Sequence, residues 1–176
     1  AVVADKTKLI WIETPANPTW SVTDITAAAE IAHAAGAQLA VDSTVASPVL
    51  TRPIEFGADI VMHSATKYLN GHSDVIAGAL ICAKKDTLWQ KMRQQRSQMG
   101  AVMGPFEATQ LLRGMRTLFL RVRQASQSAM TIAEALSGHA AVSEVLYPGL
   151  PGFPGHDIAA RQMSGGFGGM LSIRLK

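Results

Sequence analysis

The sequence predicts an α/β fold in which a mainly parallel sheet is covered by helices. Short apolar runs at residues 8–13, 38–42 and 59–64 have the length and composition of buried strands. A helical pattern at residues 21–36 and a proline-broken crossover at residues 43–58 separate these runs. Strands that alternate with helices or long crossovers are typical of parallel sheets with covering layers.

The elements of this sheet follow in order along the chain. KLIWIE, the first strand, ends in the loop TPANP, whose prolines and asparagine favour a turn. SVTDITAAAEIAHAAG then offers a Ser or Thr as a helix start, alanine-rich helical spacing, and Gly36 as a stop. QLAVD and DIVMHS predict the second and third strands, and the prolines of the intervening STVASPVLTRPIEFGA exclude a long helix there.

The remainder of the chain predicts one more strand of this sheet, several helices and the start of a second domain. VIAGALICA is a strand candidate, and DTLWQKMRQQRSQMG and PFEATQLLRGM have helical patterns. RTLFLRVRQASQSAMTIAEALSG predicts a longer helix because its apolar or small residues recur at i, i+3, i+4 spacing. VSEVLYPG, IAARQM and MLSIRL predict two strands around a short helix. We therefore expect residues 1–118 to be the C-terminal half of a large domain, and residues 119–176 a linking helix and the beginning of a small α/β domain.

Composition indicates a globular, cytoplasmic protein. Hydrophobic residues make up 48% of the 176, and the net charge of +3 with no long like-charge run gives no reason to expect nucleic acid or membrane partners. Cys82 is the only cysteine, which excludes an internal disulfide framework, and no apolar run approaches the roughly 20 residues that span a bilayer. Because the chain starts at Ala1 and stops directly after a strand-like run, we expect an interior fragment of a longer polypeptide.

Three polar residues follow three of the predicted strands. Asn17, Asp42 and Lys67 each lie at or just beyond the end of an apolar run. If the strands are parallel, all three lie at the carboxyl edge of the sheet, where open α/β sheets bind ligands. We therefore expect an amide, a carboxylate and an amine to converge there.

Each of these residues also has an ordinary structural interpretation. Asn17 and Asp42 are of types that form turns or caps, and a lysine in a polar loop is usually a solvated charge. Ser64 and Thr66 could satisfy local backbone groups. His63, His72 and Asp74 could suggest a metal, but their spacing and the absence of nearby Cys or Glu argue against a metal site.

Taken together, the three residues and two neighbouring hydroxyls suit pyridoxal phosphate (PLP). An aldehyde cofactor needs an amine with which to form an imine, and Lys67 can supply it. Asp42 can pair with the protonated ring nitrogen, which keeps the ring an electron sink. Ser64 and Thr66 can donate to the phosphate, and Asn17 can hydrogen-bond the ring hydroxyl.

The sequence resembles a known family over nearly its whole length. DIVMHSATKYLNGHSD is similar to the cofactor-lysine signature of the trans-sulfuration enzymes of cysteine and methionine metabolism, and WIETPANP, AVDST, LLRGMRTL, YPGLPGFPGH and RQMSGGFGGM match as well. This family includes cystathionine γ-synthase, cystathionine γ-lyase, methionine γ-lyase and the O-acylhomoserine sulfhydrylases. The sequence resembles cystathionine γ-synthase and cystathionine γ-lyase slightly more than methionine γ-lyase.

The resemblance implies a fold-type-I PLP-dependent architecture and a set of residue roles. Lys67 corresponds to the catalytic imine lysine, Asp42 to the pyridinium partner, Ser64 and Thr66 to the phosphate hydroxyls, and Asn17 and Thr44 to further cofactor contacts. It also implies a homotetramer whose dimers share active sites. Further contacts to cofactor and substrate would come from segments before and after this chain and from a second subunit.

The implied reaction is γ-elimination or γ-replacement on a sulfur amino acid or an O-acylhomoserine. Methionine γ-lyase and O-acylhomoserine sulfhydrylase activities are the alternatives within the family. An aminotransferase-like PLP enzyme, or a truncated chain without activity, are the alternatives outside it.

Overall fold

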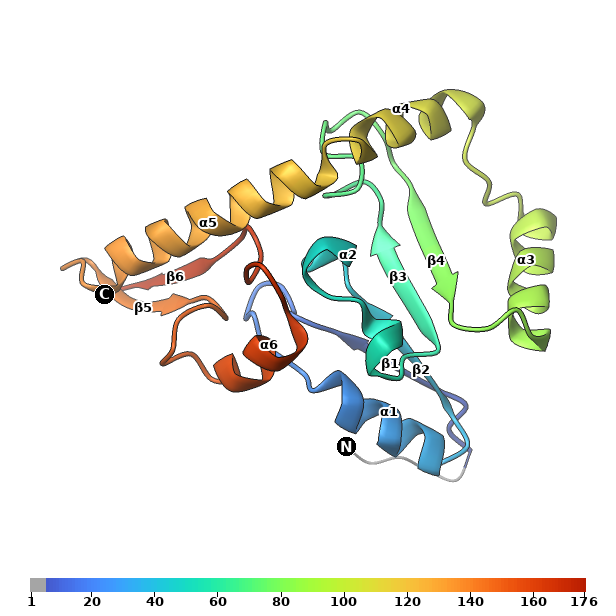
Figure 1. Cartoon of the computed structure of the whole chain (residues 1–176), viewed down its shortest axis with the longest axis horizontal. Helices are drawn as coiled ribbons and strands as arrows, with labels where there is room; N and C mark the ends of the chain where they lie inside the picture. The colour runs from blue at the N-terminus through green and yellow to red at the C-terminus, as the bar shows by residue number, and fades with distance from the viewer. Residues whose placement is uncertain (1–5) are drawn as a thin grey trace.

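A four-stranded sheet with the order β1-β2-β3-β4 carries the N-terminal part of the chain (Figure 1). The computed structural model describes residues 6–176. β1 (Leu9–Glu13), β2 (Gln38–Asp42) and β3 (Ile60–Ser64) run parallel, and β4 (Gly78–Cys82) pairs antiparallel with β3. The mainly parallel α/β fold expected from the sequence is confirmed.

The other elements also follow the order that the sequence predicts. Their bounds are α1 Ile25–Ala34, α2 Ser47–Leu50, a 3₁₀ turn Pro53–Phe56, α3 Thr87–Met99, α4 Pro105–Met115, α5 Leu118–Ser137, β5 Val142–Leu146, α6 His156–Gln162 and β6 Ser172–Leu175. β5 and β6 form a separate antiparallel pair. No helix within residues 6–176 is long and apolar enough to cross a membrane.

Helix α1 covers one face of the sheet through a small apolar core. Ile25, Ala29 and Ala32 of α1 pack with buried side chains from β2, β3 and the intervening turn, namely Leu39, Val41, Ala58 and Val61. The helix begins later than the sequence pattern suggests, because Asp24 is its N-cap and accepts a hydrogen bond from Ala27 N at 3.0 Å. Ser21 instead pairs with Ala16 in an isolated β-bridge.

Helix α5 joins the two sheets through a second core. Its first turns, at Leu118 and Val122, pack with α2, with the segment after β3 and with α6, through Ala46, Leu50, Ala65, Leu69, Ala159 and Met163. Its later turns, at Ala129 and Ala133, pack against the buried ring of Tyr147. The division into residues 1–118 and 119–176 stays a prediction, and residues 1–5 lie outside the described part.

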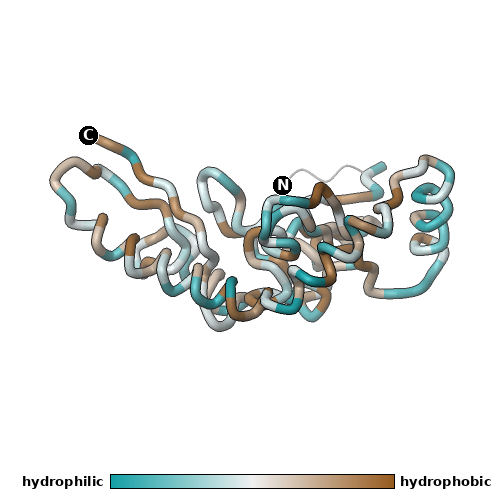
Figure 2. Tube along the Cα trace, turned by 90° about the horizontal axis from the view of Figure 1, so that it is seen from above, coloured by the Kyte–Doolittle hydropathy of each residue, from teal (hydrophilic) through white to brown (hydrophobic). Residues whose placement is uncertain are grey.

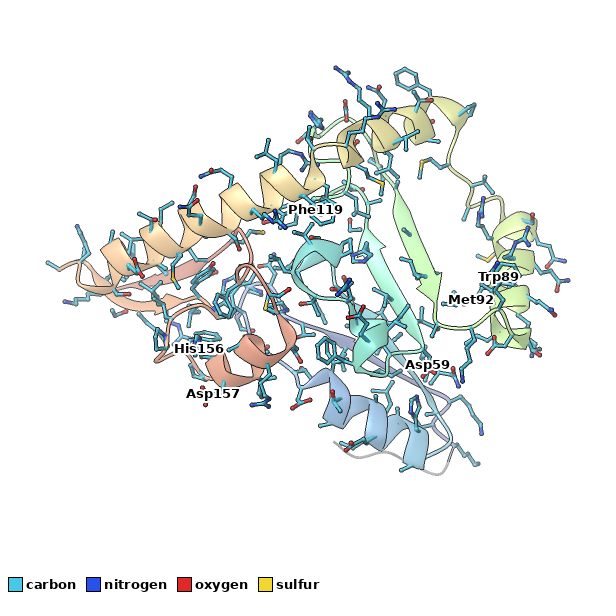
Figure 3. The ribbon with its side chains drawn as sticks, in the orientation of Figure 1. Asp59, Trp89, Met92, Phe119, His156 and Asp157 are labelled. Atoms are coloured by element: carbon cyan, nitrogen blue, oxygen red, sulfur yellow. The ribbon has the colours of Figure 1, made fainter. Side chains whose placement is uncertain are left out.

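Helix α3 contributes little to either core. It buries none of its residues, and it appears as a mostly hydrophilic coil at one end of the molecule in Figure 2. Its contact with β4 runs through Met92, whose sulfur lies 3.6 Å from Cys82 Sγ, and Figure 3 shows Met92 and Trp89 on the side facing β4. Lys85 and Arg93 lie over the ring of Trp89, at 6.0 and 4.8 Å from its centroid.

Hydrogen bonds connect the C-terminal part of the chain to the segment before α1 and to the start of that helix. Buried Gln162 accepts from Ile25 N at 3.2 Å and donates to Thr23 O at 3.0 Å. Trp20, only 1% exposed, donates from Nε1 to Ser172 Oγ at 2.7 Å. The loop that carries Asn17 is thereby held between the first and last elements of the chain.

Replacing Gln162 with Ala should lower the free energy of unfolding of the complete protein by about 1–3 kcal/mol. The substitution leaves the amide of Ile25 buried without an acceptor, which costs about that much. Chemical denaturation of wild type and variant measures the difference. Gln127→Ala, at an exposed position of α5, is the matched control and should change the free energy by less than about 0.5 kcal/mol. Equal losses in both variants would contradict this role of Gln162.

Candidate functional site

The register of the parallel strands brings three loops to one edge of the sheet. Glu13, the last residue of β1, lies opposite Asp42, the last residue of β2, and Asp42 in turn lies opposite Met62 of β3. Each of these strands leads into a loop at the same edge. Asn17, Asp42 and Lys67 are therefore at one edge of the sheet, as their positions after the apolar runs predict.

A cavity of about 960 Å³ opens at this edge. Its volume is in the range of sites that hold small molecules and cofactors. All the residues predicted for the site line this cavity: Asn17, Asp42, Thr44, Ser64, Thr66 and Lys67. The structure brings together residues that are up to 50 positions apart in the sequence, Asn17 and Lys67.

Asp42 is half-buried and held by the turn that follows it. Its Oδ1 accepts from Thr44 N at 2.9 Å, and Thr44 Oγ1 accepts from Ser64 N at 2.8 Å. Thr44 thus joins the end of β2 to the end of β3. No donor in residues 6–176 contacts Asp42 Oδ2, so this oxygen can take a cationic partner in the cavity.

Lys67 lies in a tight turn directly after β3. Its N–H donates to Ser64 O at 3.0 Å, and its own carbonyl accepts from Gly71 N at 2.8 Å. The backbone on both sides of the lysine is therefore hydrogen-bonded, whereas the side chain is exposed and its Nζ has no hydrogen bond or ion pair with a described residue. This arrangement offers a fixed attachment point with a free amine.

The two predicted phosphate hydroxyls differ in their surroundings. Thr66 Oγ1 accepts from Ala77 N at 2.9 Å and donates to Ala77 O at 3.3 Å, so it joins the lysine turn to the segment before β4. Ser64 Oγ makes no hydrogen bond within the described chain. Ser64 can donate to a phosphate as it stands, whereas Thr66 must turn its hydroxyl proton away from Ala77.

Asn17 reaches the cavity from an exposed loop. Its backbone N–H donates to Glu13 Oε1 at 3.4 Å. Ala16 N donates to Ser21 O at 3.0 Å, and Trp20 N donates to Ala16 O at 2.6 Å, so the loop is closed by backbone hydrogen bonds. The indole of Trp20 is buried and anchors this loop to the core. The amide of Asn17 is thus held at the edge without a protein hydrogen-bond partner among residues 6–176.

His63 is buried beside this edge and does not line the cavity. Burial lowers the pKa of the imidazole, and a backbone interaction with Ser43 and the negative charge of Asp42 oppose that shift only in part. Within the described residues, its Nδ1 has no hydrogen-bond partner. No group of three or more His, Cys, Asp or Glu in residues 6–176 is arranged to hold a metal ion. His63 is best described as a neutral core residue.

Other residues also line the cavity, and three of them carry polar groups that no sequence motif pointed to: Glu13, Tyr68 and Arg121. Glu13 could have been found, because it ends β1 just as Asp42 ends β2. Tyr68 directly follows the lysine, and burial raises the pKa of its phenol, which therefore stays protonated. Arg121 comes from α5, and no local motif connects it to the sheet edge.

The residues present fit PLP as a ligand. Among residues 6–176, an amine, one oxygen of a carboxylate, an amide and a hydroxyl that have no hydrogen-bond partner line one cavity. These groups match the aldehyde, the protonated ring nitrogen, the ring hydroxyl and the phosphate of that cofactor. The cofactor roles of the individual residues stay predictions.

Comparisons with known proteins connect the whole chain to one family. A family model described as Cys/Met metabolism PLP-dependent enzyme matches residues 1–176. Cystathionine gamma-synthase of Mycobacterium tuberculosis (strain ATCC 25618 / H37Rv) is 50% identical over 176 residues, which are 100% of this chain and 45% of that relative. L-methionine gamma-lyase of Porphyromonas gingivalis (strain ATCC BAA-308 / W83) is 48% identical over 166 residues, covering 93% of this chain and 41% of the relative.

A solved structure agrees with these sequence matches. Cystathionine gamma synthase from Xanthomonas oryzae pv. oryzae, in complex with cystathionine, superimposes with a TM-score of 0.93 at 47% identity. The match covers 96% of this chain and 43% of that one. The chain therefore spans less than half the length of each of these three relatives.

The buried imidazole makes a prediction about stability and pH. Because its pKa is lowered in the folded state, the unfolded chain binds the proton more readily, and stability should fall as the pH drops through the ordinary value of 6.5. A proton taken up only on unfolding changes the free energy of unfolding by at most about 1.4 kcal/mol per pH unit. His63→Asn in the complete protein should reduce the loss of unfolding free energy between about pH 7.5 and 5.5.

The measurement is denaturant unfolding at several pH values. Gln127→Asn, which introduces the same residue at an exposed position of α5 and removes no titratable group, is the control and should keep the wild-type pH dependence. A His63→Asn variant with an unchanged slope would show that this imidazole is not the group responsible.

Proposed function

Because the chain belongs to the Cys/Met metabolism PLP-dependent enzyme family, we propose that it carries the cofactor-anchoring part of an active site for γ-elimination or γ-replacement. The observation that carries this proposal is the convergence of Asn17, Asp42 and Lys67 on one cavity at the carboxyl edge of the sheet. The substrate would be a sulfur amino acid or an O-acylhomoserine.

The cavity residues divide into an anchor, an electrostatic partner and orienting groups. Lys67 would hold the aldehyde carbon of PLP covalently through its free Nζ. Asp42 would place its free Oδ2 against the ring nitrogen and keep a proton there by charge pairing. Asn17 would donate to the ring hydroxyl and prevent the ring from turning. Ser64 and Thr66 would donate to the phosphate, and Thr44 would keep Asp42 and Ser64 in register.

Bound PLP supplies a sink for the electron pair that remains when a substrate α-carbon loses its proton. Lys67 is the cavity group suited to take that proton, because it is the only lysine that lines the cavity in residues 6–176 and an amine can act as a general base. The same amine could move a proton at the neighbouring carbon before the γ-substituent leaves. The hydrogen-bonded turn around Lys67 restricts the backbone while the side chain remains free to swing.

Three relatives favour the sulfur amino acids without separating elimination from replacement. The synthase structure from Xanthomonas oryzae was solved with cystathionine bound. The Mycobacterium tuberculosis synthase and the Porphyromonas gingivalis methionine lyase are nearly equally similar to this chain, at 50% and 48% identity. Cystathionine γ-synthase or γ-lyase activity is the first candidate and methionine γ-lyase activity the second.

The assembly and the compartment belong to the same proposal. We infer a homotetramer of dimers with shared active sites, since this is the assembly that the resemblance to the family implies. We also infer a cytoplasmic location, supported by a single free cysteine, Cys82.

Lys67→Ala should abolish the covalent link to PLP. In the complete protein the visible absorbance of the lysine-bound cofactor should disappear, and borohydride should no longer fix the cofactor to the chain, because no other lysine lines the cavity in residues 6–176. Lys91→Ala, at an exposed position of α3, is the matched control and should keep both signals. An unchanged absorbance in Lys67→Ala would refute the assignment.

A substrate panel distinguishes the candidate reactions. The complete protein is incubated with cystathionine, methionine or O-acylhomoserine esters, each with and without cysteine, and the products are identified by mass. Synthase activity predicts cystathionine from an ester and cysteine, and lyase activity predicts a keto acid and a thiol. A parallel set of incubations contains an added keto acid, and amino-group transfer to it without elimination or replacement would instead indicate an aminotransferase.

A further inference from the structure

Arg121 of α5 lies against the turn that carries Lys67. Its Nη1 donates to Tyr68 O at 2.9 Å, although the two residues are 53 positions apart in the sequence. Its Nη2 donates to Gly114 O at 2.9 Å, and its Nε donates to Thr117 Oγ1 at 3.0 Å. One guanidinium therefore binds the lysine turn, the end of α4 and the start of α5.

The backbone around this guanidinium is shaped to receive it. A β-carbon at Gly71 would run into the Arg121 guanidinium, and the positive φ of 75° at this residue also favours glycine. A β-carbon at Gly114 would run into the carbonyl of Asn70. Two glycines thus allow the lysine turn, the end of α4 and the arginine to approach closely.

The charge of Arg121 suits the groups that it contacts. The carbonyl of Tyr68 lies in the turn after β3. The carbonyl of Gly114 lies in the last turn of α4, where it also accepts from Thr117 N and Thr117 Oγ1, each at 3.2 Å. Cations near such carbonyls are stabilising, and hydrogen bonds from charged donors are stronger than neutral ones. The forked guanidinium can serve three acceptors at once, which the single ammonium of a lysine cannot do in the same geometry.

We propose that Arg121 is a positioning residue that fixes the turn bearing Lys67 relative to Asp42 and Asn17. The lysine backbone is held on one side by Ser64 O and on the other by Gly71 N, and Arg121 attaches the next carbonyl to α5. Without it, the turn would keep its link to β3 and its apolar packing on α5, and would lose its hydrogen bond to that helix. The role as an aid to cofactor attachment rests on the function proposed above.

A direct role in substrate binding is the main competing explanation, because Arg121 also lines the cavity. Three of its donor atoms are occupied by Tyr68, Gly114 and Thr117, which favours the positioning role. The two roles predict different measurements. Replacing a positioning residue changes the order of the turn and the attachment of the cofactor. Replacing a substrate ligand changes KM for the amino acid.

The test uses Arg121→Ala and Arg121→Lys in the complete PLP-loaded protein. Hydrogen exchange should be about tenfold faster at the amides of Asn70 and Gly71 in Arg121→Ala, because loss of a charged hydrogen bond corresponds to about that factor. The dissociation constant for PLP should rise by about tenfold and kcat should fall, with little change in KM. Arg121→Lys should recover part of each effect, and added guanidinium ion should partly restore Arg121→Ala.

Arg123→Ala is the matched control. Arg123 lies two positions further along α5, where its guanidinium lies 5.8 Å from the ring centroid of exposed Phe119, which Figure 3 labels at the start of that helix. This control should leave exchange and PLP affinity at wild-type values.

Three outcomes would overturn the positioning role. They are unchanged exchange at residues 70 and 71 in Arg121→Ala, equal effects in the Arg123→Ala control, or a rise in KM with normal exchange and PLP affinity. If the wild-type protein lacks a lysine-bound cofactor, the proposed function fails, but the exchange comparison between Arg121→Ala and Arg123→Ala still decides whether the arginine holds the turn.

Discussion

The parallel register of the first three strands is the constraint on which the candidate site depends. Glu13, Asp42 and Met62 are neighbours across β1, β2 and β3, so the loops that follow these strands start side by side. A shift of one residue in any strand would turn its side chains to the other face of the sheet. The buried apolar residues of β2 and β3 that pack on α1 prevent such a shift.

Hydrogen bonds between the loops fix the positions of the loops relative to one another, which strand pairing alone cannot do. Thr44 connects Asp42 to the backbone of Ser64, and Thr66 connects the lysine turn to Ala77. Arg121 makes a comparable connection from α5. These contacts tie down the backbone and leave the amine of Lys67 and one oxygen of Asp42 unpaired in residues 6–176, as a site for a polar cofactor requires.

Sequence patterns predicted most of the elements because each depends on local chemistry. β2 occupies the run QLAVD, and β1 and β3 each begin one residue inside their runs. Helix α1 starts later than expected, since its N-cap is Asp24 and not one of the earlier Ser or Thr residues. The residues at the carboxyl edge could be named in advance because topology places every parallel strand end there. Their roles toward a cofactor remain predictions.

The sequence by itself determined the order of strands and helices, the residues at the strand ends and the family resemblance, because these depend on apolar periodicity, breaker residues and a long contiguous motif. Only the tertiary structure showed that Arg121 binds the lysine turn and that the Thr66 hydroxyl is hydrogen-bonded to the backbone of Ala77. It also showed that His63 is buried and does not line the cavity. The physical reason is that a contact across 53 positions depends on how helices pack on the sheet, and no local pattern records that packing.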